Sequence, residues 1–168
     1  MAEQIDVAKE MSETEIYEQM CSSLKHILKI DEPIISNLSI FTALFKQSFA
    51  KISWIGFYIL KNDCLWLGPF QGKLACTRIE TGKGVCGTAV QQRDTIIVEN
   101  VEEFPGHIAC DSDSKSEIAI PVFQGENIWG VLDIDSHQKN AFNNTDKEYL
   151  EKICKFLSVR LDLSENLI

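Results

Sequence analysis

The sequence predicts an α+β domain in which an antiparallel sheet is flanked by N- and C-terminal helices. Two observations support this fold class. Apolar residues recur at helical spacing near both ends of the chain, and β-branched and aromatic runs separated by short polar turns fill its middle. The 168 residues, 45% of them hydrophobic, suffice for one core, so we expect a loose tail over residues 1–11 and a single domain over residues 12–168.

Three helices are predicted from caps and periodicity. Ser12 and Glu15 have the spacing of a capping box, and Pro33 suits the first turn of a second helix that we expect to run toward Ala50. Thr145 and Glu148 predict the cap of a closing helix. Apolar residues on one face of the first helix follow its cap: Ile16, Met20, Leu24, Ile27 and Leu28.

The strands are predicted as two hairpins and two shorter segments. Residues 53–60 and 64–70 flank a polar turn, whereas 77–79 and 95–100 are short strand candidates. The clearest hairpin pairs 116–123 with 127–136. Aliphatic residues alternate along both of its strands and predict a shared core face: Ile118, Ile120, Val122, Ile128, Leu132 and Ile134.

Pairing these two sets fixes the register of the hairpin, for example with Ile118 opposite Ile134 and a three-residue turn over 125–127. The opposite face then carries Glu117, Asp133 and Asp135. Because clustered carboxylates repel one another, we expect each to be stabilised by a cation or to take up a proton. Apolar residues are predicted to share this face, which is therefore no ordinary charged exterior: Ala119, Pro121, Trp129 and Val131.

Composition disfavours several classes of protein and site. A formal net charge of -9 opposes binding to a phosphate backbone, so we expect no nucleic-acid partner. No apolar stretch is long enough for a signal peptide or a membrane span, which favours a soluble, cytoplasmic protein. Clustered carboxylates suit calcium or magnesium, but the spacing of an EF-hand is absent and we predict no metal site.

Six cysteines in a reducing compartment are expected to be mostly free thiols at rest. Three lie in predicted helices or at the start of a strand and are expected to pack as small apolar residues: Cys21, Cys64 and Cys154. The other three lie in segments rich in glycine and polar residues: Cys76, Cys86 and Cys110. Because no CxxC pair is present, these three favour thiol redox chemistry over a structural zinc site.

Five segments together point to a known family: WIGFYIL, GPFQGKLACTRI, GKGVCGTAV, FPGHIACDSDSKSEI and GVLDIDS. In this order they closely resemble the free methionine-(R)-sulfoxide reductases, which are GAF-domain enzymes, over roughly residues 12–160. Two residues depart from the family pattern, Leu74 where proline is common and Glu102 where histidine is frequent. Neither position touches the chemistry that the resemblance implies.

The resemblance implies an enzyme that reduces free L-methionine-R-sulfoxide to methionine, with a role against oxidative stress. It implies Cys110 as the nucleophile and Cys76 as its recycling partner, with a Cys76–Cys110 disulfide in the oxidised protein. Cys86 is the rival for the attacking or the resolving role. No bound cofactor is expected, and thioredoxin with NADPH would supply the electrons. The attacking thiol needs activation, for which His107 and backbone amides are candidates.

The resemblance also implies a set of substrate-binding residues. Glu117, Asp133 and Asp135 match the family's substrate-binding acids, and Trp54 and Tyr58 match aromatic residues of its pocket. A protonated Glu117 would deliver a proton to the sulfoxide oxygen, while the two aspartates would hold the ammonium group. A methionine inside a peptide has no free α-ammonium, which explains a preference for the free amino acid.

Two other functions remain open at this point. One is a GAF-type module that binds a small ligand and signals through a partner, although the chain contains no output domain. The other is a redox switch whose cysteines report oxidant. Both predict no catalytic consumption of methionine sulfoxide. The sequence does not decide between a monomer and a homodimer.

Overall fold

The computed structural model describes residues 11–108 and 110–163. Over these residues, six strands form one antiparallel sheet in the order β3-β2-β1-β6-β5-β4. The predicted α+β fold is therefore confirmed. All of the predicted tail except Met11 lies outside the described residues, so the boundary of the domain stays a prediction.

The predicted strands are present with small changes at their ends. The strands of the first hairpin are β1 (Trp54–Lys61) and β2 (Cys64–Gln71), and those of the last are β5 (Ser116–Gln124) and β6 (Asn127–Ser136). The two outer strands are short, β3 (Arg78–Glu80) and β4 (Ile96–Val98). Because β1 pairs with β6, the two hairpins join at the centre of the sheet.

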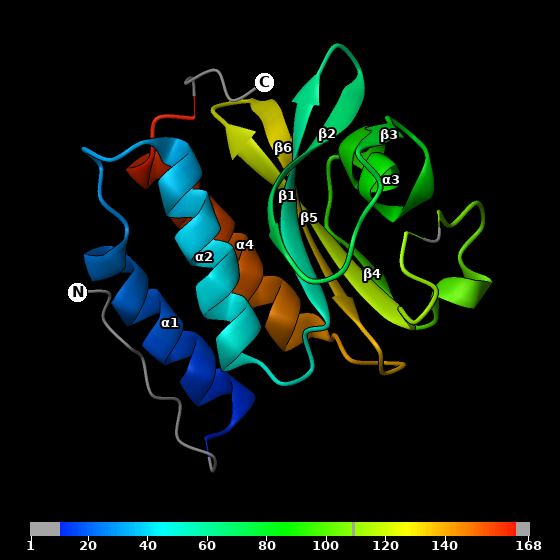
Figure 1. The fold of residues 1–168 in the computed structure, drawn as a ribbon, viewed down its shortest axis with the longest axis horizontal. Coiled ribbons are helices and arrows are strands. Elements are labelled where there is room, and N and C mark those ends of the chain that lie inside the picture. Colours follow the sequence, from blue (N-terminus) through cyan, green and yellow to red (C-terminus); the bar gives the residue numbers. More distant parts are fainter. Residues whose placement is uncertain (1–10, 109, 164–168) are drawn as a thin grey trace.

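Helices cover the two faces of the sheet unequally (Figure 1). On one face lie α1 (Glu13–Ile27), α2 (Ile34–Ser48) and α4 (Asn144–Arg160), with α1 packed against the other two helices. On the other face lies α3 (Gly84–Gln92), and a short 3-10 helix (Val101–Glu103) begins the long loop that leads to β5. None of the helices in the described chain is both long and apolar enough to cross a membrane.

The caps confirm one prediction and correct another. Ser12 and Glu15 form the predicted capping box of α1. The cap of α4 is Asn143 with Asp146, so the prediction of Thr145 and Glu148 was wrong. Asp146 is fully buried and accepts hydrogen bonds from Tyr17 and Lys51, each at 2.7 Å, and these contacts fix the first turn of the helix around Asp146.

The last hairpin has the predicted register near the centre of the sheet but not at its turn. Ile118 lies opposite Ile134, as predicted. Between Val122 and Phe123 the register shifts, so that Gln124 pairs with Asn127 and the turn contains two residues rather than three. This β-bulge reverses the predicted faces of the β6 residues between the turn and Gly130.

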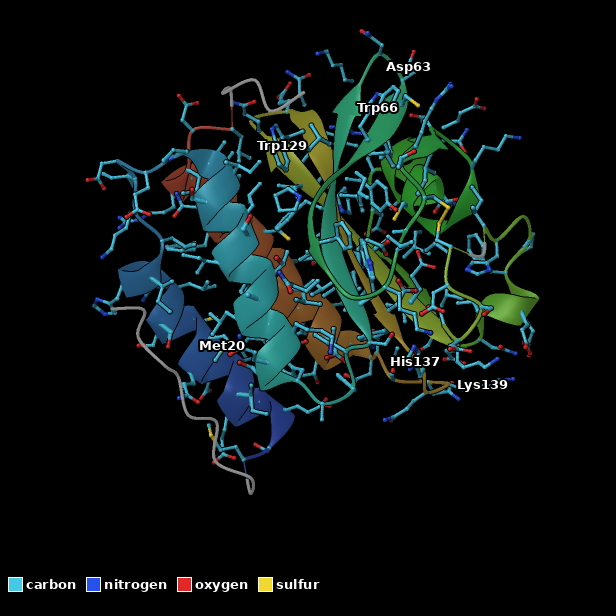
Figure 2. The ribbon with its side chains drawn as sticks, viewed as in Figure 1. Met20, Asp63, Trp66, Trp129, His137 and Lys139 are labelled. Carbon is cyan, nitrogen blue, oxygen red and sulfur yellow. A yellow bond between two sulfur atoms is a disulfide. The ribbon has the colours of Figure 1, made fainter. Side chains whose placement is uncertain are left out.

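The reversal explains two wrong assignments in the sequence analysis. Trp129 packs on the helix-covered face, edge-on to Phe57 with ring centroids 6.3 Å apart, rather than beside the acids. Figure 2 places Trp129 on the side of the sheet that faces the helices. Ile128 packs on the opposite face. A pattern of strict alternation cannot anticipate one extra residue in a strand.

Candidate active site

Three carboxyl groups form the floor of a pocket on the face that carries α3. Glu117 on β5, Asp135 on β6 and Trp54 on β1 are cross-strand neighbours in one row. Asp133 lies two residues away from Asp135 on the same face of β6. Glu117 and Asp133 are each only 6% exposed, and Asp135 is half-buried. The predicted acidic face is therefore present, covered by protein rather than by bulk water.

Burial and mutual repulsion disfavour negative charge on this floor. Burial raises the pKa of Glu117 well above its usual value, and the charge of Asp135 raises it further. The pKa of Asp133 is raised by burial and then by Glu117, and that of Asp135 by burial and then by Asp133. Both effects favour the protonated carboxyl groups, so the floor is suited to donate protons unless a cation compensates its charge.

Two aromatic side chains of β1 line the pocket and reach the loop that follows β2. The Trp54 indole N–H donates to the carbonyl oxygen of Lys73 at 3.1 Å, and the Tyr58 hydroxyl donates to the carbonyl oxygen of Cys76 at 2.9 Å. A Cβ atom at Gly56 would overlap the Trp54 ring, so glycine lets the indole lie flat across the strand. Both aromatic residues predicted at the site therefore line the pocket.

A disulfide closes one side of the pocket. Cys76, in the loop after β2, is bonded to Cys110, in the loop before β5, with Cα atoms 5.4 Å apart. This is the pairing that the family resemblance implied. Both cysteines are half-buried, and two side chains beside them are exposed at the rim, Leu74 and Ile108.

Cys86 lies in a different environment from the disulfide. The sequence placed it in a glycine-rich loop, but it occupies the first turn of α3 and is 2% exposed. Its Sγ atom lies 3.9 Å from Oε1 of Glu117, within reach for a thiol donor. Burial raises the pKa of the Cys86 thiol, and the charges of Asp133 and Glu117 raise it further. The environment of Cys86 therefore favours the neutral thiol.

His107 also lies in the pocket, and its contact there was missed in the sequence analysis. Its Nε2 atom is 3.6 Å from Oε2 of Glu117, and burial lowers the pKa of its imidazole. From the sequence, His107 is expected only as an activator of Cys110. His107 and Glu117 are ten positions apart and joined by a loop, so no local pattern could reveal their contact.

The floor is built to receive a cation. The donor atoms of Cys86, Glu117 and Asp133 lie within 4.8 Å of one another, a spacing that suits a metal ion or an ammonium group. Oδ1 of Asp133 is buried and has no hydrogen-bond partner among the described residues. The pocket encloses a cavity of about 30 Å³, which is room for a water molecule.

The predicted site residues thus converge on one pocket. Its lining includes Trp54, Tyr58, Cys86, Cys110, Glu117, Asp133 and Asp135, and Cys76 joins it through the disulfide. The three cysteines predicted to be structural do not line the pocket: Cys21, Cys64 and Cys154.

Comparisons with known proteins match almost the whole chain. Residues 12–161 match the GAF domain model. GAF domain-containing protein A of Dictyostelium discoideum is 48% identical over 158 residues, covering 94% of this chain and 99% of that protein. Free methionine-R-sulfoxide reductase of Saccharomyces cerevisiae is 39% identical over 165 residues, covering 94% and 92%. Free methionine-R-sulfoxide reductase of Neisseria meningitidis, solved with its substrate, superposes with a TM-score of 0.88 at 37% identity, covering 97% and 96%.

Proposed function

The chain belongs to the GAF domain family and groups there with the free methionine-R-sulfoxide reductases, and from this we propose that it reduces free L-methionine-R-sulfoxide to methionine. One observation supports the proposal above all others: a disulfide-bonded pair of cysteines lies beside a floor of three carboxyl groups, of which Glu117 and Asp133 are buried and Asp135 is half-buried. The pair of cysteines is suited to take oxygen from sulfur, and the acidic floor is suited to hold an amino acid by its ammonium group.

The acidic floor provides the basis for substrate recognition. The substrate's ammonium group would donate hydrogen bonds to Asp133 and Asp135, and the unpartnered Oδ1 of Asp133 supplies one acceptor. The Trp54 ring would pack against the methyl group of the sulfoxide. A methionine within a peptide lacks the ammonium group and would leave these acids without a cation, so the free amino acid is preferred.

Cys110 is the better candidate for the nucleophile. A thiolate is the attacking species, and the buried position of Cys86 next to two acids disfavours its thiolate. Cys110 is half-buried and already bonded to Cys76, its expected recycling partner. We assign Cys86 a supporting role, in which its thiol donates to Glu117.

The reaction transfers one oxygen atom from substrate to enzyme. The Cys110 thiolate attacks the sulfoxide sulfur, Glu117 gives its proton to the sulfoxide oxygen, and the S–O bond of the substrate breaks as the oxygen passes to Cys110. The products are methionine and a Cys110 sulfenic acid. His107, close to Glu117, can return a proton to this carboxylate for the next cycle.

Recycling consumes two electrons from an external dithiol. The Cys76 thiol attacks the sulfenic acid sulfur, an S–S bond forms, and the hydroxyl group leaves as water. Thioredoxin, itself reduced by NADPH, would then reopen the disulfide in the cytoplasm. Because Cys110 attacks as a free thiolate, reduction of the disulfide precedes the next attack on a substrate.

The proposal is tested by following methionine formation with thioredoxin, its reductase and NADPH. The substrates are free methionine-R-sulfoxide, its S epimer and a peptide that contains methionine sulfoxide. Turnover of the free R form alone supports the proposal. A ligand-binding module or a redox switch would consume none of the three substrates, and that result would overturn the proposal.

Cys110→Ser should reduce turnover by about 10³-fold or more, because no other pocket thiol is suited to replace the nucleophile. Cys86→Ser should keep turnover within about tenfold, because a hydroxyl can still donate to Glu117. Cys21→Ser, on α1 and away from the pocket, is the matched control and should match the natural chain. Loss of turnover in Cys86→Ser with retention in Cys110→Ser would exchange the two roles.

A further inference from the structure

Each cysteine of the disulfide lies on its own loop, and the two loops differ in the hydrogen bonds that hold them. We call residues 72–77 the Cys76 loop, and residues 104–108 with 110–115 the Cys110 loop. The Cys76 loop is held to β1 at two points of its backbone, by the Trp54 indole at Lys73 and by the Tyr58 hydroxyl at Cys76. Its position is therefore fixed by the sheet.

The Cys110 loop is held to β6 at its end, where the amide of Lys115 donates to the carbonyl oxygen of Ser136 at 2.7 Å, and nearer to Cys110 its backbone hydrogen bonds lie within the loop. The amide of His107 donates to the carbonyl oxygen of Phe104 at 3.1 Å, and the amide of Ser114 donates to that of Asp111 at 3.2 Å. Bonds of this kind give the loop a local shape but do not fix it relative to its neighbour. Once the disulfide is open, contacts between the two loops add to those with the sheet in setting the position of Cys110 relative to Cys76.

Lys73 makes such a contact. Its Nζ atom lies 3.2 Å from Oδ1 of Asp111 and 2.5 Å from Oδ2 of Asp113. Asp111 directly follows Cys110 in the sequence, and Lys73 precedes Cys76 by three residues. The ion pairs therefore join the two loops right beside the cysteines that must meet.

The acceptor side of this contact is preorganised. The Asp111 side chain is only 9% exposed, and its Oδ1 atom also accepts from the backbone amide of Asp113 at 3.0 Å. Its other oxygen lies 3.4 Å from Nε2 of His137, at the end of β6 (Figure 2). An ion pair with one buried and oriented partner is stronger and less screened than one between two mobile surface groups.

We propose that Lys73 is a positioning residue for disulfide formation. Through Asp111 and Asp113 it holds the Cys76 loop against the Cys110 loop. It does so while both cysteines are reduced and while Cys110 is a sulfenic acid. The inference rests on the proposed function for its place in the cycle. The ion pairs of Lys73 would raise the effective concentration of the Cys76 thiol at Cys110. Lys73 itself does not touch the reacting atoms.

The test measures the equilibrium between the dithiol and the disulfide in glutathione buffers, by alkylation and peptide mapping of Cys76 and Cys110. In this equilibrium the two thiols reduce one glutathione disulfide to two glutathione thiols, and no sulfoxide is present. Each protein is measured at about 0.01 M and about 1 M salt, where the screening length falls from about 30 Å to about 3 Å.

We expect Lys73→Met to lower the equilibrium constant for disulfide formation by about three- to tenfold at low salt and to remove its dependence on salt. Lys73→Arg should restore both. Lys139→Met is the matched control, because Lys139 (Figure 2) is similarly exposed and its partner Glu102 belongs to neither loop. A Lys73→Met constant equal to that of the natural chain, with the same salt dependence, would overturn the proposal.

A single-turnover experiment separates this inference from the proposed function. With Lys73→Met, methionine should form at the natural rate while the disulfide forms more slowly, and equal rates of disulfide formation would count against the positioning role. If the natural chain forms no methionine, the proposed function fails, and the glutathione equilibrium still decides whether Lys73 positions the cysteines.

Discussion

The two faces of the sheet are built from the same strands and serve different purposes. On the helix-covered face, aliphatic and aromatic residues such as Phe57, Ile118 and Ile134 are fully or almost fully buried among apolar neighbours. On the pocket face, their neighbours in sequence include Tyr58, Glu117 and two aspartates with raised pKa values. Alternation along a strand thus lets one segment provide stability on one side and chemistry on the other.

The largest effect on stability is expected on the helix-covered face. Phe57 is fully buried, with its ring 5.3 Å from that of Phe41, so Phe57→Ala should lower the free energy of unfolding by about 3–5 kcal/mol. Tyr58→Phe, one residue along the strand but on the pocket face, should cost only about 1 kcal/mol for the lost hydrogen bond to Cys76. Urea unfolding measures both. Equal losses in the free energy of unfolding for Phe57→Ala and Tyr58→Phe would contradict the expected difference between the two faces.

A change on the pocket face should affect catalysis instead. Glu117→Gln keeps the shape of the side chain but removes the acidic proton, so turnover should fall by about 100-fold. Its free energy of unfolding should not fall. Glu126→Gln, in the exposed turn of the same hairpin, is the control and should keep full turnover. Unchanged turnover in Glu117→Gln would exclude Glu117 as the proton donor.

The smallest expected effect concerns how stability depends on pH. Because the folded-state pKa of Glu117 is raised, the folded protein binds more protons than the unfolded chain above about pH 4, and stability falls as pH rises. Glu117→Gln should remove part of this fall in the free energy of unfolding. The variant should therefore be more stable than the natural chain by about 1 kcal/mol at pH 8, but not at pH 4. Urea unfolding at both values measures the difference, and a gain in stability of the natural chain with rising pH would contradict it.

Features set by local patterns could be predicted from the sequence. The cap at Ser12, the pairing of Ile118 with Ile134 and the shared face of Glu117, Asp133 and Asp135 all follow from spacing along one or two neighbouring segments. Each depends on a period of 2 or 3.6 residues, which the sequence displays directly.

Features that break a period or join distant segments could not be predicted. The bulge that moves Trp129 to the helix-covered face depends on one extra residue in β6, and Cys86 is buried because α3 packs over the sheet. The contact between Lys73 and the two aspartates spans 38 and 40 residues, and nothing in the local sequence of either loop indicates it. The disulfide was anticipated only through the resemblance to a family.

The arrangement of the helices has a practical consequence. Because α1 and α4 lie on the face opposite the two cysteine loops (Figure 1), their exposed lysines, such as Lys25 and Lys152, offer attachment points far from the pocket. Coupling to a bead or an electrode through this side would leave the pocket and the disulfide directed toward solution. The molecule is thereby suited to immobilisation in a sensor, with the opening and closing of one disulfide as its signal.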